Sequence, residues 1–428
     1  MTPPGTDPAP PLTRLPDGTI KQVNPFTGTK VWTLPGRGAR PLGLDRPAPQ
    51  PLDPSERDRH CAFCVGRMVE TTPEIARVVR DGPSWQEVRG LLADQLDDSV
   101  PQFRLFTNLF EILSYDYWHL THGYEPTPES RAHRTAYLST PAGREHVAAL
   151  ARIRMRAGGT SGADAGPLTE GDLEREAVAL FAGNHQVVAA RRHYADGATN
   201  DSQHAFSGTL TPEEHWQYTR FTIAAVRDLY RDNPYARYVS VFQNWMRSAG
   251  ASFDHLHKQL VAIDEPGAEL EREVERVRSQ PDFFARWGRE YADAQGLVIA
   301  RTPTAVAFAG VGHRYPSVEV HTSATSRRPW ELDDDEVRDF SDLLHACHAA
   351  TGSDVPTNEE WHHCPPPLDL PVPLRAVVKW RVSTLGGFEG ATRIYVTTMD
   401  PWTVRERTVT RLRGLADRGV VSGRITVD

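Results

Sequence analysis

The most informative pattern of polar and apolar positions lies near the middle of the chain, in residues 242–263, FQNWMRSAGASFDHLHKQLVAI. A turn of small residues, Ala249–Ser252, comes before an alternating stretch that predicts a β-strand. Because side chains alternate along a strand, His255, His257 and Gln259 are expected on one face. Two imidazoles and an amide in a row behind a small-residue turn are unusual on a buried strand. This stretch is therefore predicted to carry a functional site.

Hydrophobic periodicity predicts the other regular elements. Strands are expected at 103–108, 184–193, 238–242, 305–309, 318–321 and 376–382, and helices at 211–230 and 333–349. The first of these helices begins with Thr211, Pro212 and Glu214, which together form a capping box with proline in the first turn. Residues 114–180 are polar with a helical period and predict a helical insertion.

The order strand, helix, strand with Asn and Trp, and final strand occurs twice along the chain, with the paired histidines only in the first copy. This repetition predicts an internal duplication. Residues 1–20 are rich in proline and lack apolar periodicity, so a disordered N-terminal tail is expected there.

Composition and charge are those of an ordinary globular enzyme. The 428 residues are 39% hydrophobic and 24% charged, with a formal net charge of −8. A negative net charge gives no indication of a basic surface that would bind nucleic acid or an anionic membrane, so neither partner is expected. No apolar run reaches the length of a membrane span, and the N-terminus lacks an apolar signal core, so a cytoplasmic protein is expected.

The chain has four cysteines, two of them in the Cys-x-x-Cys turn of Cys61 and Cys64. So few cysteines predict no disulfide framework, and the pair suggests either a metal site or a redox site. Two thiolates supply half of a tetrahedral zinc site, so the other ligands would be histidine or carboxylate. A thioredoxin-like pair is the alternative, but the strand expected before it is missing. Zinc is favoured.

These residues resemble the galactose-1-phosphate uridylyltransferase family of the histidine-triad superfamily. The family's Asn, Ser and His-x-His-x-Gln spacing is kept by Asn244, Ser252, His255, His257 and Gln259. The resemblance extends from Asn24, Pro25 and the Arg37/Arg40 loop through Cys61/Cys64 and Asn108 to Trp361–His362 and Gly387–Glu389. It implies an α+β fold of duplicated histidine-triad-like units, with antiparallel sheets flanked by helices. Residues 21–265 would form the catalytic domain, and residues 266–428 the second domain.

The resemblance also implies the role of each matching residue. His257 would be the nucleophile that takes a nucleoside monophosphate from a nucleotide sugar, and Gln259 and Ser252 would hold the phosphate oxygens. Arg37, Arg40, Asn108, Asn244 and Glu389 would bind substrate. Zinc would be held by Cys61, Cys64, His255 and a second histidine, either His193, which is preferred, or His204. The arginine loop would reach a neighbouring subunit, implying a homodimer.

Several positions depart from the family pattern. Leu256 replaces the proline usual between the two histidines, Lys379 and Arg381 stand where relatives carry a second metal pair, and Tyr395 stands where a glutamine is expected. The predicted reaction is ping-pong transfer of the nucleotide to a sugar 1-phosphate. A phosphorylase that uses an ADP-sugar or a dinucleoside polyphosphate as donor and inorganic phosphate as acceptor is the alternative. A zinc-stabilised binding protein with an inactive site, and a histidine-triad hydrolase, are further alternatives; Gln259 stands where a hydrolase usually has a third histidine.

Overall fold

A computed structural model describes residues 10–36, 48–157, 168–323 and 328–428. Within these ranges, twelve strands form one sheet in which all neighbours are antiparallel, in the order β5-β4-β6-β7-β9-β8-β13-β14-β12-β11-β10-β16. The strands of its first half are β4 (Glu74–Asp81), β5 (Ser84–Arg89), β6 (Pro101–Thr107), β7 (His185–Ala190), β8 (Tyr238–Trp245) and β9 (His257–Ile263). Those of its second half are β10 (Val298–Arg301), β11 (Ala305–Ala309), β12 (Ser317–Thr322), β13 (Thr357–His362), β14 (Arg375–Trp380) and β16 (Thr426–Val427).

The two halves of the sheet repeat one strand order. The order β4-β6-β7-β9-β8 corresponds to β10-β11-β12-β14-β13, and a long helix precedes the innermost strand in each half. This is the arrangement expected from the predicted duplication. The halves meet where β8 pairs with β13, with Asn244 opposite Asn358, so they share one continuous sheet.

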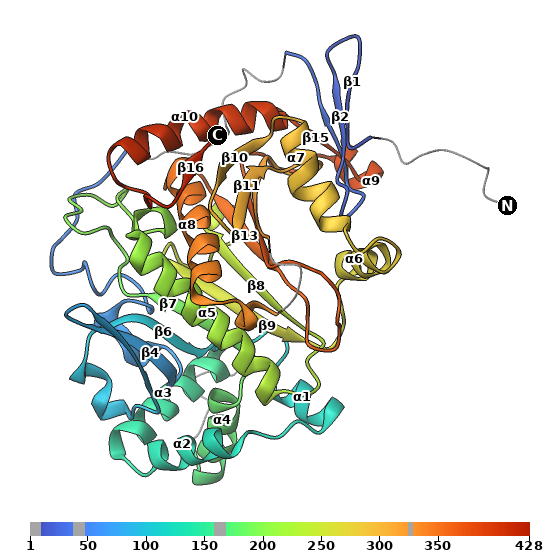
Figure 1. Ribbon diagram of the computed structural model, residues 1–428. Helices are drawn as coiled ribbons and strands as arrows, with labels where there is room; N and C mark the ends of the chain where they lie inside the picture. Colours follow the sequence, from blue (N-terminus) through green and yellow to red (C-terminus); the bar gives the residue numbers. More distant parts are fainter. Residues whose placement is uncertain (1–9, 37–47, 158–167, 324–327) are drawn as a thin grey trace.

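Two long helices cover one face of this sheet, α5 (Pro212–Asp232) and α8 (Asp334–Thr351), and they lie side by side in Figure 1. Helix α5 begins as predicted, because the Thr211 hydroxyl accepts a hydrogen bond from the Glu214 backbone in a capping box. The predicted α+β architecture, with antiparallel sheets flanked by helices, is confirmed. No described helix combines the length and apolar character that crossing a membrane requires.

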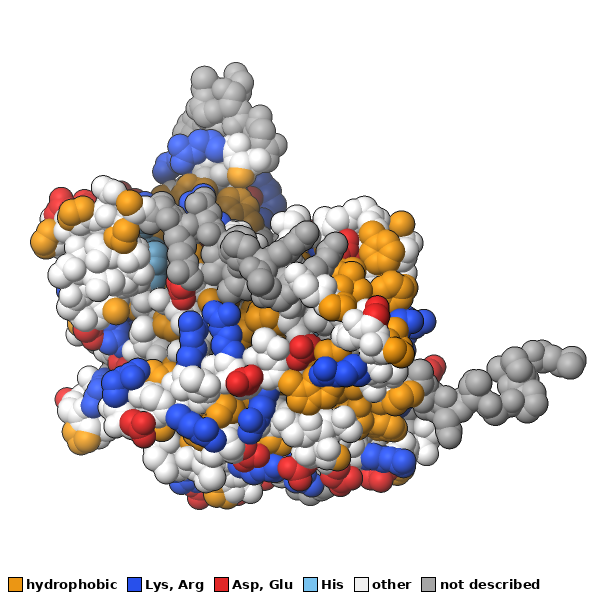
Figure 2. Space-filling view, turned by 90° about the horizontal axis from the view of Figure 1, so that it is seen from above, with side chains coloured by type: hydrophobic (Ala, Val, Ile, Leu, Met, Phe, Trp, Pro, Cys, Tyr) orange, Lys and Arg blue, Asp and Glu red, His pale blue; other side chains and the backbone are white. Residues whose placement is uncertain are grey.

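Four helices fill the region predicted as an insertion and lie together at one end of the molecule (Figure 1): α1 (Tyr115–His122), α2 (Pro128–Leu138), α3 (Pro141–Ala157) and α4 (Glu170–Phe181). The remaining helices are α6 (Ala268–Ser279), α7 (Tyr291–Ala294), α9 (Gly387–Thr392) and α10 (Pro401–Asp417). On the face seen in Figure 2, basic and acidic side chains are interspersed, as expected for a surface of mixed charge.

A second, small sheet joins the beginning of the chain to its end. It contains β1 (Leu12–Arg14), β2 (Ile20–Val23) and β3 (Lys30–Thr33), and β3 pairs in parallel with β15 (Ile394–Thr397). The predicted disorder of residues 1–20 is therefore wrong for residues 12–14, where a short strand pairs with β2. The packing of this hairpin against the second half of the molecule stabilises a segment that has no apolar periodicity of its own.

Candidate active site and metal cluster

The Cys-x-x-Cys turn meets two histidines from distant parts of the chain. One ligand atom from each of Cys61, Cys64, His193 and His255 lies within 4.8 Å of all the others, and all four residues are buried. The two sulfurs are 3.8 Å apart, and Nδ1 of His193 and of His255 lie 3.4 and 3.5 Å from Cys61 Sγ. Zn–S bonds of about 2.3 Å at tetrahedral angles separate two sulfurs by about 3.8 Å. The four donors therefore fit a tetrahedral metal ion.

Hydrogen bonds prepare this cluster for a metal. His255 Nε2 donates to the Ala190 carbonyl oxygen at 2.6 Å, which leaves the Nδ1 lone pair for a metal. A hydrogen bond from Cys61, followed by those with the two imidazoles, outweighs the effect of burial and lowers the pKa of the Cys64 thiol. The ring of His204 lies 5.5 Å from that of His193 and outside the cluster. His193, and not His204, therefore lies within the cluster.

His257 begins strand β9, directly beside this cluster. Its Nδ1 donates to the His255 carbonyl oxygen at 2.7 Å, so its lone pair is on Nε2, and Nε2 has no hydrogen-bond partner among the described residues. Burial lowers the pKa of His257 to about 4. The ring is therefore neutral near pH 7 and presents one nucleophilic nitrogen.

The Cys-x-x-Cys turn also supports His257 through an aromatic contact. The ring of Phe63, between the two cysteines, lies 5.1 Å from the His257 ring and 6.0 Å from the His255 ring. A metal that fixes this turn therefore also fixes a ring that packs against His257. His255 was predicted on the same strand face as His257, but β9 begins at His257 and His255 lies in the bend before it.

His185 on β7 orients the amide of Gln259. The Ile112 backbone N–H donates to His185 Nδ1 at 3.2 Å, and His185 Nε2 lies 2.9 Å from Gln259 Oε1. Burial lowers the pKa of His185, so a neutral ring accepts at Nδ1 and donates from Nε2. With its oxygen occupied in this way, Gln259 directs its NH2 group away from His185, where it can donate to a phosphate oxygen.

The turn before β9 is held by the second half of the molecule. Asn358 Nδ2 donates to Asn244 Oδ1 at 2.7 Å and to the Ala249 carbonyl at 2.8 Å, and Arg381 donates to Asn358 Oδ1 at 2.6 Å. Gly250 in this turn has φ of +93°, which glycine adopts without strain. The turn carries the exposed Ser252, whose hydroxyl has no partner among the described residues. Ser252 lines a cavity of about 430 Å³, which His257 and Gln259 do not line.

The other residues predicted to bind substrate do not all lie near His257. Asn108 lies next to this constellation, with its amide nitrogen 3.2 Å from His185 Nε2. Arg37 and Arg40 are outside the described residues. The carboxylate of Glu389 accepts from the Gly386 backbone at the start of its own helix, α9, and forms no hydrogen bond with the described residues of the His257 site. Within one chain, Glu389 therefore belongs to helix α9, which comes just before β15 of the small sheet.

Sequence reasoning missed His185, Asn358 and Arg381 as contributors to this site. His185 stands one residue after Asn184 at the start of a predicted strand, and only its pairing with β9 reveals its position. Asn358 is 114 residues from Asn244, and the β8–β13 pairing brings the two together.

Comparison with known proteins shows similarity over most of the chain. The chain is 22% identical over 399 residues to ADP-glucose phosphorylase of Arabidopsis thaliana, covering 88% of this chain and 89% of that protein. The crystal structure of an Arabidopsis ADP-glucose phosphorylase with bound ADP-glucose covers 91% of this chain and 98% of its own, with a TM-score of 0.57 and 20% identity. A GalT-like protein of the same plant covers the same shares, with a TM-score of 0.56 and 19% identity.

These matches confirm the predicted resemblance to galactose-1-phosphate uridylyltransferase-like proteins at the level of the fold. A family model described as a domain of unknown function, DUF4921, matches residues 15–428. Because this match spans nearly the whole chain, the protein belongs to the DUF4921 family.

Proposed function

We propose that this protein transfers a nucleoside monophosphate from a nucleotide sugar to inorganic phosphate through a covalent intermediate on His257. The free Nε2 of a neutral, buried His257, oriented by its Nδ1 hydrogen bond, is the observation that carries this proposal. The likeness to a relative named ADP-glucose phosphorylase supports phosphate as the acceptor. Leu256 between the two histidines supports the same choice, since it departs from the uridylyltransferase pattern.

In the first step, His257 Nε2 attacks the α-phosphorus of the nucleotide sugar. A bond between nitrogen and phosphorus forms as the bond from phosphorus to the bridging oxygen breaks, and the electron pair leaves with the sugar 1-phosphate. The Gln259 amide, fixed by His185, and the Ser252 hydroxyl stabilise the charge that builds on the non-bridging oxygens. In the second step an oxygen of inorganic phosphate attacks the same phosphorus, which releases His257 and a nucleoside diphosphate.

Zinc is the metal we propose for the cluster of two cysteines and two histidines, because this donor set and its spacing suit Zn²⁺. When bound, the ion supplies a structural cross-link rather than a Lewis acid in contact with the substrate. It ties the Cys61–Cys64 turn to His255, whose carbonyl oxygen orients His257.

A second candidate is transfer to a sugar 1-phosphate, as in uridylyltransferases, which the His-x-His-x-Gln spacing favours. The acceptor test uses enzyme loaded with a labelled nucleotide and then offered inorganic phosphate, galactose 1-phosphate or water alone. Phosphate is expected to discharge the label as a nucleoside diphosphate. Discharge only by galactose 1-phosphate would establish the second candidate, and discharge by water alone would indicate a hydrolase.

We also propose that the protein works as a homodimer in the cytoplasm. Glu389 lies in helix α9, just before β15, which pairs with β3 in the small sheet, and it forms no hydrogen bond with the described residues of the His257 site of its own chain. The resemblance implies that the loop of Arg37 and Arg40 reaches a neighbouring subunit. Mixing inactive His257→Ala with inactive Arg40→Ala should therefore restore activity in heterodimers, whereas no recovery would argue against shared sites.

A further inference from the structure

The face of the sheet that bears His257 continues into the second half of the molecule. Asn244 stands opposite Asn358, and Glu360 and His362 follow on the same face of β13 because side chains alternate. The register then places Arg375 opposite both His362 and His321, and Val377 opposite both Glu360 and Glu319. Strands β12 and β14 correspond to β7 and β9 of the first half. They present polar side chains at the position where β7 and β9 carry the His257 site.

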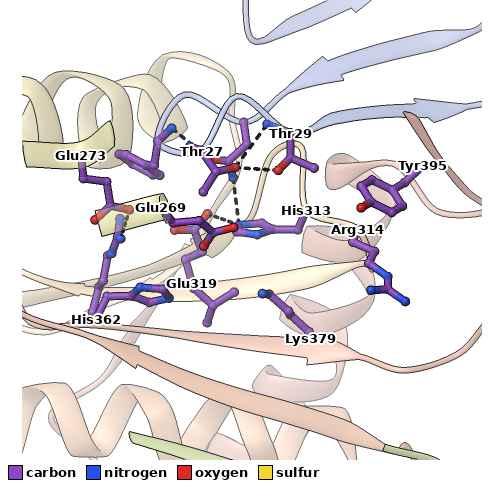
Figure 3. A pocket seen from close by; sticks show the side chains of 14 residues that line it. Thr27, Thr29, Glu269, Glu273, His313, Arg314, Glu319, His362, Lys379 and Tyr395 are labelled. Atoms are coloured by element: carbon purple, nitrogen blue, oxygen red, sulfur yellow. Dashed lines mark hydrogen bonds and ion pairs between the residues drawn. The ribbon is translucent and has the colours of Figure 1, made fainter. Parts of the chain in front are cut away.

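A cavity of about 240 Å³ lies on this part of the face. Figure 3 shows that its walls come from several elements: Thr27 and Thr29 from the N-terminal turn, Glu269 and Glu273 from α6, His362 and Lys379 from the strands, and Tyr395 from the small sheet. The nucleotide-site residues His257, Gln259 and Ser252 do not line it. It is therefore separate from the site described above.

The charges that line this cavity cancel. Three carboxylates face three cations, namely Glu269, Glu273 and Glu319 against Arg314, Arg375 and Lys379, so the formal sum is zero. Most of these charges are already engaged. Arg375 forms a buried ion pair with Glu273, Lys379 pairs with Glu360 at 2.5 Å, and Glu319 accepts hydrogen bonds from His313 and His321 at 2.7 and 2.9 Å. A charged ligand would have to compete with these internal pairs.

Neutral hydrogen-bonding groups of this cavity remain free. The ring of His362 and the hydroxyl of Tyr395 have no hydrogen-bond partner among the described residues that line the cavity, and both are partly buried. Burial, followed by the charges of Arg375 and Lys379, holds the pKa of His362 well below its ordinary range, so the ring offers one donor and one acceptor. The hydroxyls of Thr27 and Thr29 lie 2.7 Å apart and leave a further donor between them.

The geometry points to a second binding site here, for a small uncharged ligand with several hydroxyl groups, such as a single sugar ring or a cyclic polyol. Hydroxyl groups match free donors and acceptors of both kinds without disturbing the ion pairs, and the Tyr395 hydroxyl is one of these groups while the Arg314 guanidinium lies over the Tyr395 ring, 5.7 Å from its centroid. The volume is below the 300–1,000 Å³ typical of sites for larger ligands, which excludes a whole nucleotide sugar. This site goes beyond the proposed function.

The test measures binding of D-glucose, D-galactose and myo-inositol by saturation-transfer NMR and calorimetry, without nucleotide, with inorganic phosphate and glucosamine as charged comparators. At least one neutral ring is expected to bind more tightly than either charged compound. Removing one hydrogen bond in Tyr395→Phe, or the imidazole in His362→Leu, should weaken this binding about three- to tenfold. Tyr235→Phe, on the exposed surface, is the matched control and should bind as the wild type does.

The His257→Gly variant separates this site from the nucleotide site. It should keep sugar binding at the wild-type affinity while forming no nucleotide adduct, and His362→Leu should keep normal adduct formation. The inference is overturned if the wild type binds no neutral ring, if phosphate or glucosamine binds more tightly, or if Tyr395→Phe leaves the affinity unchanged. It is also overturned if sugar binding is lost in His257→Gly, since the sugar would then occupy the nucleotide site.

Discussion

His185 Nε2 and Gln259 Oε1 lie 2.9 Å apart on the neighbouring strands β7 and β9, and this contact fixes which end of the Gln259 amide faces the His257 site. The backbone N–H of Ile112 donates to Nδ1 of His185, so the neutral ring carries its single proton on Nε2. His185 therefore acts as the donor in its hydrogen bond with Gln259. A residue 74 positions away from Gln259 thereby determines the hydrogen-bonding direction of a predicted catalytic side chain.

Replacing His185 by phenylalanine should lower kcat for nucleotide transfer about tenfold or more, because the freed amide can present its oxygen to the phosphate. One lost oriented donor typically costs a factor of about 10²–10³ when it is removed outright, so misorientation should cost less. His185→Gln, which can still donate to Gln259, should recover part of the rate. An equal loss of rate in both variants, with lowered melting temperatures, would indicate a purely structural role. His119→Phe, at an exposed histidine of α1, is the control.

Removing one cluster ligand should remove the metal. Cys64→Ser and His255→Asn are expected to lose about one equivalent of zinc per chain and to unfold at a lower temperature, because a structural metal contributes its binding energy to folding. Elemental analysis and thermal unfolding are the measurements. His204→Ala and Cys347→Ser lie outside the cluster and should retain the metal. Zinc retained by Cys64→Ser but lost from His204→Ala would contradict the assignment.

The two halves of the sheet are joined by a buried ion pair beneath α5 and α8. Lys258 on β9 pairs with Glu359 on β13, both side chains are fully buried, and His348 of α8 bonds Glu359 at 2.6 Å. Burial alone would raise the pKa of Glu359, but Lys258 and His348 outweigh it and lower that pKa. Glu359 is therefore ionised, while burial lowers the pKa of Lys258 and the charge of Glu359 opposes that shift.

Glu359→Gln should lower the free energy of unfolding by about 3–5 kcal/mol, since Lys258 would be left buried without its counter-charge. Urea denaturation measures this. The double variant Lys258→Met, Glu359→Leu should lose much less, because it removes both charges. Glu70→Gln, which breaks the exposed pair with Arg67, should change stability by about 1 kcal/mol at most. A loss as small in Glu359→Gln as in Glu70→Gln would refute the role of the buried pair.

Glu111 should make stability depend on pH. Burial raises its pKa to about 7, although backbone N–H groups of His185, Asn184 and Tyr115 oppose the shift. The folded state thus holds a proton that the unfolded state releases above about pH 4.5, so this contribution to stability is greatest below pH 4.5 and is lost as the pH rises toward 7. At 1.36 kcal/mol per pKa unit the loss is about 3 kcal/mol.

Glu111→Gln cannot ionise and should abolish this part of the pH dependence. Unfolding free energies measured at pH 5 and at pH 8 should fall less in this variant than in the wild type. Glu125→Gln, at an exposed carboxylate, should retain the wild-type difference. Identical pH profiles for the wild type and Glu111→Gln would show that the carboxyl ionises normally.

Local chemistry made several features predictable from the sequence. The Thr211–Glu214 capping box determines where α5 begins, and the spacing from Asn244 to Gln259 identified the neighbourhood of His257. The preference for His193 over His204 also agrees with the structure, because the end of β7 carries the chain past the Cys61–Cys64 turn.

Long-range pairing made other features unpredictable. The continuous sheet depends on the register between β8 and β13, and the turn before Ser252 is held through Asn358 from the second half of the molecule. The strand at Leu12–Arg14 forms because it pairs with β2, and the sequence there has no apolar periodicity that would predict a strand. In each case the interaction joins two segments of the chain, and no motif in the sequence indicates that these segments pair.

The covalent intermediate on His257 is tested most directly by intact-protein and peptide mass spectrometry of the protein mixed with ADP-glucose. We expect an added nucleoside monophosphate on the peptide that contains His257, its disappearance when inorganic phosphate is added, and no adduct in His257→Gly. An adduct on another residue, or glucose 1-phosphate release by His257→Gly at the wild-type rate, would contradict it.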